Sequence, residues 1–345
     1  MTIDNMALHD FAAAVLKAAG FDEATAGEMA ELLVWANLRG VDSHGVMRLP
    51  RYVEMLSLDM LKTDFEIVEV RRGGATCLID AGKAPGATAM NRAVEIASTL
   101  ADASGLGWCS VRNTSHAGAI GYFVQKLARA GKIGIAMTAS KPLMSYHGAK
   151  GEALSSNPLA IGIPQPDGRS PIILDMSTAS VALGKIMAAK DAGRPIPLGW
   201  AVDADGADTT DPHKVAALLP MAGAKGSGLA LMIEILCSLL AANPSIAPAL
   251  SGGKSGGFNG MVLAVDPGAF GDRDGFLAHV ADLADAIHRL EPAANVDQVL
   301  LPGERGDATE ASRREGGVPV AKGTATKLAA LARQLGVAVP PALEA

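Results

Sequence analysis

The chain has 345 residues, of which 49% are hydrophobic, 19% are charged and only 4% are aromatic. This balance excludes a disordered polyelectrolyte and predicts a large core of aliphatic side chains, in a chain long enough for about two domains. The net charge is −6 and no long basic run occurs, so a nucleic-acid-binding surface is not expected either.

The first part of the chain, residues 6–60, is expected to be helical. Apolar residues recur at helical spacing between positions 8 and 16, and Gly20 ends that run. A second helix should begin near Asp22, and a third should span Val46 to Leu56. No strand is predicted in this part of the chain.

Beyond residue 65, short β-branched or apolar runs alternate with helical stretches. The predicted strands are Ala75 to Ile79, Ile133 to Met137, Ile172 to Leu174 and Met261 to Val265. The predicted helices are Ala89 to Ala103, Tyr122 to Ala130, Leu229 to Leu240, 274–290 and 322–335. Long loops are predicted over 141–170, 192–226 and 243–260, and irregular chain over the charged segment 301–320. This alternation indicates an α/β fold, and loops of such length are often functional in enzymes.

The cellular location follows from the cysteines and from the absence of a targeting segment. Cys77, Cys109 and Cys237 are odd in number and far apart, which argues against a disulfide framework and fits a reducing cytosol. The first residues resemble no signal peptide. The most apolar stretch, Leu229 to Ala242, contains Glu234 and is too short to span a bilayer. We therefore expect a cytoplasmic protein without a membrane partner.

Two glycine-rich segments are candidate phosphate sites, although the G-x-G-x-x-G fingerprint of a Rossmann fold is missing. Gly223 to Gly228 contains Lys225 and precedes the helix predicted from Leu229. Free N–H groups and a lysine at a helix N-terminus can bind an anion, but an ordinary tight loop explains the pattern equally well. Gly252 to Gly257 resembles a P-loop only superficially, because Pro248 occupies the position of the first glycine. We expect a surface loop there.

The segment Asp42 to Tyr52 holds the greatest density of reactive side chains. Arg48 and Tyr52 are four residues apart and would share one face of a helix. Arginine can bind a carboxylate through two parallel hydrogen bonds, and a histidine such as His44 can donate a proton near neutral pH. Consecutive Asp, Ser and His side chains diverge, so the run is not a hydrolase triad. A capped helix with a solvated polar face is the alternative interpretation.

His116 follows an apolar, strand-like run and precedes a predicted helix. Loops in this position commonly carry catalytic groups, although a hydrogen-bonded loop histidine without a catalytic role is equally consistent. His9, His213, His279 and His288 lie in polar contexts and are expected at the surface. No close ligand spacing occurs among the histidines, so no metal site is predicted.

An ordered set of motifs, spread over residues 30–325, resembles the type-2 malate/L-lactate dehydrogenase family. The motifs are Asp42–Gly45 with Arg48 and Tyr52, Ser115–Tyr122, Asn157–Ala160, Asp175–Thr178, Gly184–Lys185, Ile196–Trp200, Thr210–Pro212, Leu219–Pro220, Gly223–Gly226 and Leu301–Glu304. The resemblance implies a non-Rossmann, mixed-sheet nucleotide domain over 71–271. It also implies a helical domain formed by both chain ends, 1–70 and 272–345, and a homodimer with its active site between the domains.

The resemblance further implies hydride transfer between NAD or NADP and C2 of a small 2-oxo or 2-hydroxy carboxylic acid. It assigns catalysis to His44 and His116 with Ser43, and carboxylate binding to Arg48 and Tyr52. The implied cofactor contacts are Ser140, Asn157, Pro158, Asp175, Met176, Ser177, Lys225, Gly303, Glu304 and Arg305. We favour His44 over His116 as the proton carrier. Reduction of a cyclic imino acid and a non-catalytic nucleotide-binding role remain alternatives.

Overall fold

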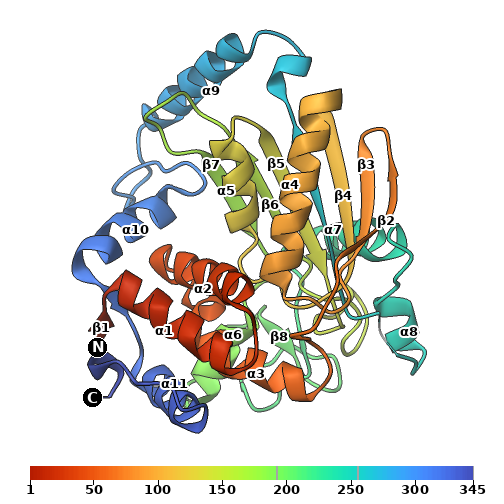
Figure 1. Ribbon diagram of the computed structural model, residues 1–345. Helices are drawn as coiled ribbons and strands as arrows, with labels where there is room; N and C mark the ends of the chain where they lie inside the picture. Colours follow the sequence, from red (N-terminus) through yellow and green to blue (C-terminus); the bar gives the residue numbers. More distant parts are fainter. Residues whose placement is uncertain (192, 255, 345) are drawn as a thin grey trace.

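A seven-stranded mixed sheet forms the centre of the computed structural model, which describes residues 1–191, 193–254 and 256–344 (Figure 1). In spatial order the strands are β2 (Val68–Gly73), β3 (Thr76–Asp80), β4 (Leu106–Thr114), β10 (Phe258–Val265), β5 (Ile133–Ala139), β6 (Leu159–Ile163) and β7 (Ile172–Met176). β3 and β4 run parallel, whereas the other neighbouring strands run antiparallel. A doubly wound Rossmann sheet is mostly parallel, so the prediction of a non-Rossmann mixed sheet is confirmed.

Helices cover both faces of this sheet. α4 (Gly86–Ser104) and α5 (Gly121–Arg129) pack on one face, whereas α7 (Ala224–Glu234) and the π-helical segment Ile235–Leu239 pack on the other. Alternate residues of β10 therefore enter different clusters: Val262 joins the core beneath α4, and Met261 joins the cluster around α7. This period of two is what a strand buried on both faces requires.

A helical layer built from both chain ends packs beside the sheet (Figure 1). Its members are α1 (Asn5–Ala18), α2 (Glu23–Leu38), α3 (Leu49–Ser57), α10 (Glu304–Gly316) and α11 (Lys322–Gln334). The two ends are joined directly, because β1 (Thr2–Ile3) pairs with β11 (Val318–Pro319). α9 (Arg273–His288) lies apart from this layer, at the top of Figure 1. The predicted division into two domains stays a prediction.

Most of the predicted elements are confirmed. β3, β5, β7 and β10 contain the four predicted strands, and α1, α2, α4, α5, α9 and α11 account for most of the predicted helices. The helix predicted over Val46 to Leu56 begins only at Leu49, the first residue of α3. Two short 3₁₀ turns, Asp42–His44 and Val46–Arg48, precede it. The break occurs because the extended Gly45 packs against Asn37, which a Cβ atom at Gly45 would approach to within 2.2 Å.

The prediction of irregular chain over 301–320 is wrong, since α10 occupies most of this segment. α10 has no buried side chain and therefore shows no apolar periodicity that a sequence could reveal. The predicted long loops also contain regular elements, namely β6, β8 (Ala201–Val202), β9 (Ala217–Leu218) and α8 (Ile246–Leu250). α6 (Leu183–Asp191) was not predicted at all. Among the described helices, none is both long and apolar enough to cross a membrane.

Candidate active site

The two histidines of separate motifs lie against each other. His44 ends the 3₁₀ turn after α2, and His116 lies in the loop between β4 and α5. Their imidazole rings stack with centroids 5.6 Å apart and an interplanar angle of 20°. Both residues are half-buried. The fold thus brings together the two proton carriers that the sequence suggested.

The surroundings keep both imidazoles neutral at physiological pH. Burial, together with the positive charge of Arg48, lowers the pKa of His44 to about 4. Burial also lowers the pKa of His116 well below its ordinary value, again with a contribution from Arg48. A neutral imidazole can accept a proton, which is the task of a general base. An anion bound at Arg48 would oppose one cause of these shifts and raise both pKa values.

Each imidazole has one ring nitrogen held by a hydroxyl group. Ser43 Oγ lies 3.0 Å from His44 Nδ1, and Tyr52 Oη lies 3.0 Å from His116 Nδ1. Burial raises the pKa of Tyr52 to about 12, so its phenol stays protonated and can donate to His116. The Nε2 atoms of both rings are left for other partners. Tyr52 thus orients His116, and its predicted contact with the substrate stays a prediction.

Arg48 has the free hydrogen-bonding capacity that a carboxylate site needs. Its Nε donates to the backbone oxygen of Ser43 at 2.7 Å. Within residues 1–191, 193–254 and 256–344, its terminal guanidinium nitrogens have no hydrogen-bond or ion-pair partner. Arginine binds carboxylates through such a pair of terminal N–H groups. The half-buried Arg48 therefore suits an anionic ligand beside the histidine pair.

Sequence analysis missed several residues that shape this site. The ring of Phe258 meets His116 edge-on, with centroids 6.2 Å apart. Gly86, at the start of α4, is needed because a Cβ atom there would lie 2.4 Å from the backbone oxygen of His116. These contacts come from distant segments and have no local sequence signal. Gly184 of α6, which belongs to one of the sequence motifs, also lies beside the site: a Cβ atom on it would lie 3.4 Å from Ser43 Cβ.

Asp175, one of the predicted cofactor contacts, lies near the end of β7. Its carboxylate accepts a hydrogen bond of 2.8 Å from the N–H group of Gly121, at the start of α5. Desolvation raises the pKa of Asp175 to about 6, although the residue keeps exposed surface. Met176 and Ser177 follow it, and Ser177 Oγ donates to the backbone oxygen of Ser156 at 3.4 Å.

Three further predicted contacts lie on or beside β5 and β6. Ser140 Oγ lies 2.8 Å from Ser155 Oγ. Asn157 is completely buried and donates from Nδ2 to the backbone oxygen of Ala230 at 2.8 Å, whereas its Oδ1 atom has no partner. The neighbouring Pro158 accepts a backbone hydrogen bond through its oxygen. Asn157 therefore joins the sheet to α7, and it can contact a cofactor only if this segment moves.

The glycine-rich segment around Lys225 differs from its prediction. α7 begins at Ala224 and not at Leu229, so the segment forms the first turns of the helix. The N–H groups of Gly223, Lys225 and Gly226 donate to carbonyl oxygens of the preceding turn. The expectation of free N–H groups here is wrong for these three residues. The exposed ammonium of Lys225 has no hydrogen-bond or ion-pair partner in the described part of the chain.

The second glycine-rich segment, Gly252 to Gly257, follows α8. Lys254 is exposed there, as expected for a surface loop, and position 255 lies outside the described residues.

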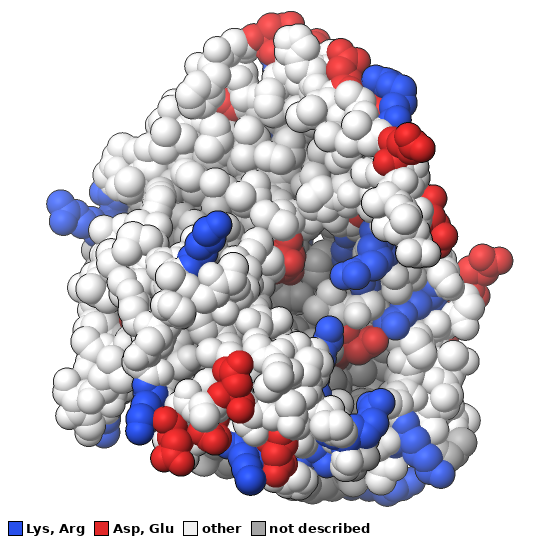
Figure 2. Space-filling view, turned by 180° about the vertical axis from the view of Figure 1, so that it is seen from behind, with Lys and Arg blue, Asp and Glu red and all other residues white. Residues whose placement is uncertain are grey.

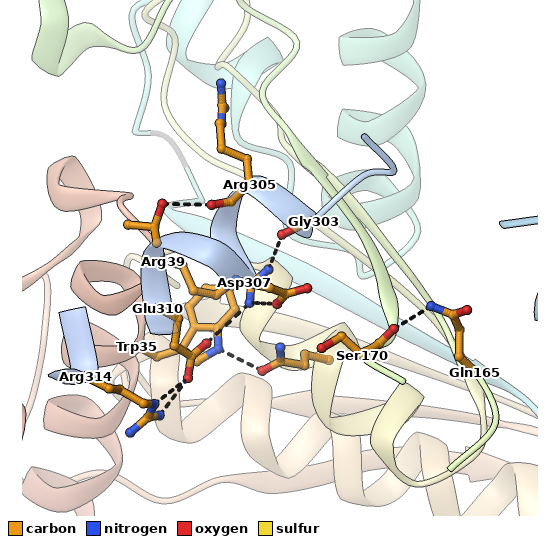
Figure 3. Close-up of polar contacts among 11 residues, drawn as sticks. Trp35, Arg39, Gln165, Ser170, Gly303, Arg305, Asp307, Glu310 and Arg314 are labelled. Atoms are coloured by element: carbon orange, nitrogen blue, oxygen red, sulfur yellow. Dashed lines mark hydrogen bonds and ion pairs between the residues drawn. The ribbon is translucent and has the colours of Figure 1, made fainter. Parts of the chain in front are cut away.

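The loop of Gly303, Glu304 and Arg305 meets the sheet at β7. Gly303 has a φ of +100°, and a Cβ atom there would lie 3.1 Å from the backbone nitrogen of Ile173, so glycine is required. Glu304 accepts a hydrogen bond from Leu301 N at 2.8 Å and contacts His288 at 2.8 Å. The Arg305 guanidinium points away from the ion pairs of α10 (Figure 3). Figure 2 shows a deep hollow on the rear face with lysine and arginine side chains along one side.

Comparison with known sequences identifies one family over nearly the whole chain. The malate/L-lactate dehydrogenase family matches residues 3–329. Ureidoglycolate dehydrogenase (NAD(+)) of Escherichia coli strain K12 is 33% identical over 326 residues, which cover 93% of each chain. A (2R)-3-sulfolactate dehydrogenase (NADP(+)) of Chromohalobacter salexigens is 34% identical and covers 88% of this chain and 90% of its own.

Solved structures agree with these sequence matches. Malate dehydrogenase from Pyrococcus horikoshii OT3 superposes with a TM-score of 0.89 at 29% identity, covering 99% of this chain and 97% of that one. The Δ1-piperideine-2-carboxylate reductase from Pseudomonas syringae superposes with a TM-score of 0.82 at 26% identity, covering 96% and 99%. The unusual mixed sheet is thus common to enzymes that differ in substrate.

Proposed function

Since the chain belongs to the malate/L-lactate dehydrogenase family, we propose that it transfers hydride between NAD(P)H and C2 of a small 2-oxo or 2-hydroxy carboxylic acid. The observation that carries this proposal is the stacked His44–His116 pair beside Arg48, whose terminal nitrogens have no hydrogen-bond or ion-pair partner in the described part of the chain. The site therefore combines a carboxylate clamp with proton carriers, the two groups that this chemistry needs from the protein.

The side chains present fit a nicotinamide dinucleotide. A bound nicotinamide supplies or accepts the hydride, and the protein supplies geometry and proton delivery. Lys225 and Arg305 carry charges without an ion-pair partner among the described residues, so they would hold the phosphates. Asp175 would border the cofactor. The relatives include NAD- and NADP-dependent enzymes.

The substrate carboxylate would bind to the terminal nitrogens of Arg48. This contact holds C2 in place and partly cancels the positive charge that lowers the pKa of both imidazoles. We assign the proton to His44: Ser43 occupies its Nδ1, so its Nε2 would meet the C2 oxygen. In reduction, C2 gains the hydride, the carbonyl π pair moves onto oxygen, and this oxygen takes the Nε2 proton of a protonated His44, which is left neutral. In oxidation, the neutral His44 removes the hydroxyl proton as hydride leaves C2.

Reduction of a cyclic imino acid is the second candidate, and the structural match to Δ1-piperideine-2-carboxylate reductase favours it. An imino acid also presents a carboxylate and an electrophilic C2, so the same Arg48 and His44 would serve. The atom protonated would be nitrogen instead of oxygen. A substrate test must therefore include both classes. A non-catalytic nucleotide-binding role would show as cofactor binding without turnover of either class.

We also propose that the protein is a cytoplasmic homodimer. Two large apolar side chains of α6, the helix whose Gly184 approaches Ser43, are Leu183 and Met187, which are 45% and 49% exposed. Exposed apolar side chains that adjoin a site suit an interface between subunits. The cysteines, all buried and unpaired, are compatible with a reducing compartment. Light scattering coupled to size-exclusion chromatography measures the oligomeric state, and a monomer at all concentrations would contradict the dimer.

The proposed function is tested by the oxidation of NADH and of NADPH against a panel of 2-oxo acids and cyclic imino acids. Loss of the reduced-nicotinamide absorbance with any oxo acid supports the main proposal. Turnover of imines alone replaces it with the second candidate. Cofactor binding by fluorescence without turnover moves the test to the oxidation of ureido- and sulfonated 2-hydroxy acids. The absence of both turnover and cofactor binding would overturn the proposal.

A further inference from the structure

The N-terminal end of α10 is bound by Arg39, a buried arginine that directly follows α2 (Figure 3). Arg39 is only 7% exposed and donates from Nη2 to the backbone oxygen of Gly303 at 2.9 Å. It also forms ion pairs with Asp307 and with Glu310, the latter at 3.4 Å. A Cβ atom on Gly306 would lie 2.8 Å from Arg39, so the helix approaches this side chain as closely as a glycine allows. Arg39 thus holds the loop of the proposed cofactor contacts.

The other end of α10 holds the turn that carries His44. Arg313 donates to both carboxylate oxygens of Asp42, at 2.7 Å and 3.1 Å, and to the backbone oxygen of Asn37. Asp42 Oδ1 also accepts a hydrogen bond of 2.7 Å from Asn37 Nδ2. A bidentate pair of this kind fixes orientation as well as distance. Asp42 is separated from His44 only by Ser43.

Asn37 closes the turn from its other side. Its Oδ1 accepts a hydrogen bond of 2.8 Å from the N–H group of Val46, and its side chain is almost completely buried. A Cβ atom on Gly45 would clash with this oxygen at 2.2 Å. The chain around His44 is therefore held before the histidine by Asp42 and after it by Val46. Asn37 makes both contacts, through its side-chain nitrogen to Asp42 and its side-chain oxygen to Val46. Arg313 of α10 binds the Asp42 carboxylate and the backbone oxygen of Asn37.

We propose that Arg313 and Asp42 are positioning residues for His44, and that α10 links the cofactor loop at Gly303 to the proton carrier. This inference rests on the proposed function only for the role of His44 as a proton carrier. Because α10 has no buried side chain, ion pairs and not apolar packing determine where it lies. The Arg313 side chain is 16% exposed and that of Asp42 is 46% exposed, so solvent partly screens the pair. Its loss should therefore disturb the geometry at His44 more than the fold.

The first test is Arg313→Met in the full-length protein. We expect kcat to fall about 10- to 100-fold, as a small misplacement of a catalytic group does, while the Kd for NADH changes less than about twofold. Asp42→Asn should produce a similar loss. The double variant should be no worse than either single variant, because both remove one interaction. Arg313→Lys should restore part of kcat, since lysine keeps the charge without the bidentate geometry.

Arg314→Met is the matched control. Arg314 is the next residue of the same helix, its side chain is 54% exposed, and it pairs with Glu310 instead of Asp42. We expect kcat within about twofold of the wild type. Equal losses in Arg314→Met and Arg313→Met would overturn the proposal, as would an Arg313→Met variant that retains more than half of the wild-type kcat. If the kcat losses of Asp42→Asn and Arg313→Met multiply in the double variant, the proposal is also overturned.

A second readout needs no substrate and separates this inference from the proposed function. The imidazole NMR signals of His44, assigned with His44→Gln, should shift in Arg313→Met and stay in place in Arg314→Met. A wild type that turns over no substrate but shows this pattern would contradict the proposed function and support the positioning. Unchanged His44 signals in Arg313→Met would overturn the positioning, whatever the activity.

Discussion

The histidine site and helix α10 are two functional regions that are held in place in different ways. Around His116 and Tyr52, side chains are desolvated, stacked and hydrogen-bonded within the protein. α10 instead lies on the surface without a buried side chain, and arginine ion pairs fix both of its ends. The site therefore depends on short-range packing, whereas α10 depends on charge. The histidine site should therefore be insensitive to salt and sensitive to pH, whereas the attachment of α10 should be sensitive to salt.

The largest expected effect is at the centre of the packed region. His44→Ala should lower kcat by about 10²- to 10⁴-fold, because general acid–base groups contribute a factor of this order. The Kd for NADH should stay nearly unchanged, since the imidazole is assigned to the proton and not to the cofactor. His9→Ala, on the exposed face of α1, is the control and should leave kcat intact. A His44→Ala variant with more than about a tenth of wild-type kcat would transfer the role to His116.

A smaller effect is expected for the carboxylate clamp. Arg48→Met should reduce kcat/KM by roughly 10- to 100-fold, the equivalent of hydrogen bonds to a charged group worth about 1.5–3 kcal/mol. It should also let the pKa of His44 rise, because the charge of Arg48 helps to lower it. Arg51→Met, which removes an exposed arginine paired with Glu54, serves as the comparison. Equal kcat/KM in the two variants would exclude Arg48 as the clamp.

The packed region should also make stability depend on pH. His44 and His116 are held neutral in the folded protein, whereas in the unfolded chain they take up protons near their ordinary pKa of about 6.5. The unfolded state then binds more protons, so the free energy of unfolding should fall as the pH drops from about 6.5 towards about 4. Asp175 contributes with the opposite sign. His44→Gln should therefore be compared with the wild type, and its pH dependence should be shallower. An identical slope would contradict the neutral His44.

The smallest effect distinguishes the two regions by salt. Raising NaCl to about 1 M shortens the Debye length to about 3 Å and should weaken the pair of Arg313 with the half-exposed Asp42 more than the pairs of the buried Arg39. We expect faster amide hydrogen exchange in the C-terminal turns of α10, while α4 and β4 behind His116 keep their protection. Equal acceleration in all of these elements would show that α10 is held no differently from the core.

The chain's local patterns predicted much of the fold and the chemistry of the site. Apolar residues at helical spacing predicted α1 and α4, and long apolar stretches predicted α2 and α5, which are buried on most sides. Residue type predicted His44, Arg48 and His116, since the chemistry of a carboxylate and a proton leaves few alternatives. The ordered motifs identified the family, which the matches along nearly the whole chain confirmed.

Only the tertiary structure determined which residues from distant segments are in contact. The sequence could not predict that Tyr52 would bind His116, because 64 residues separate them. Nor could it show that the charged segment after Gly303 is a helix, since Arg39 and Asp42 hold it from positions more than 260 residues away. Side-chain chemistry and periodicity are local and can be read along a chain. Ion pairs and hydrogen bonds between distant segments form only once the fold has brought those segments together.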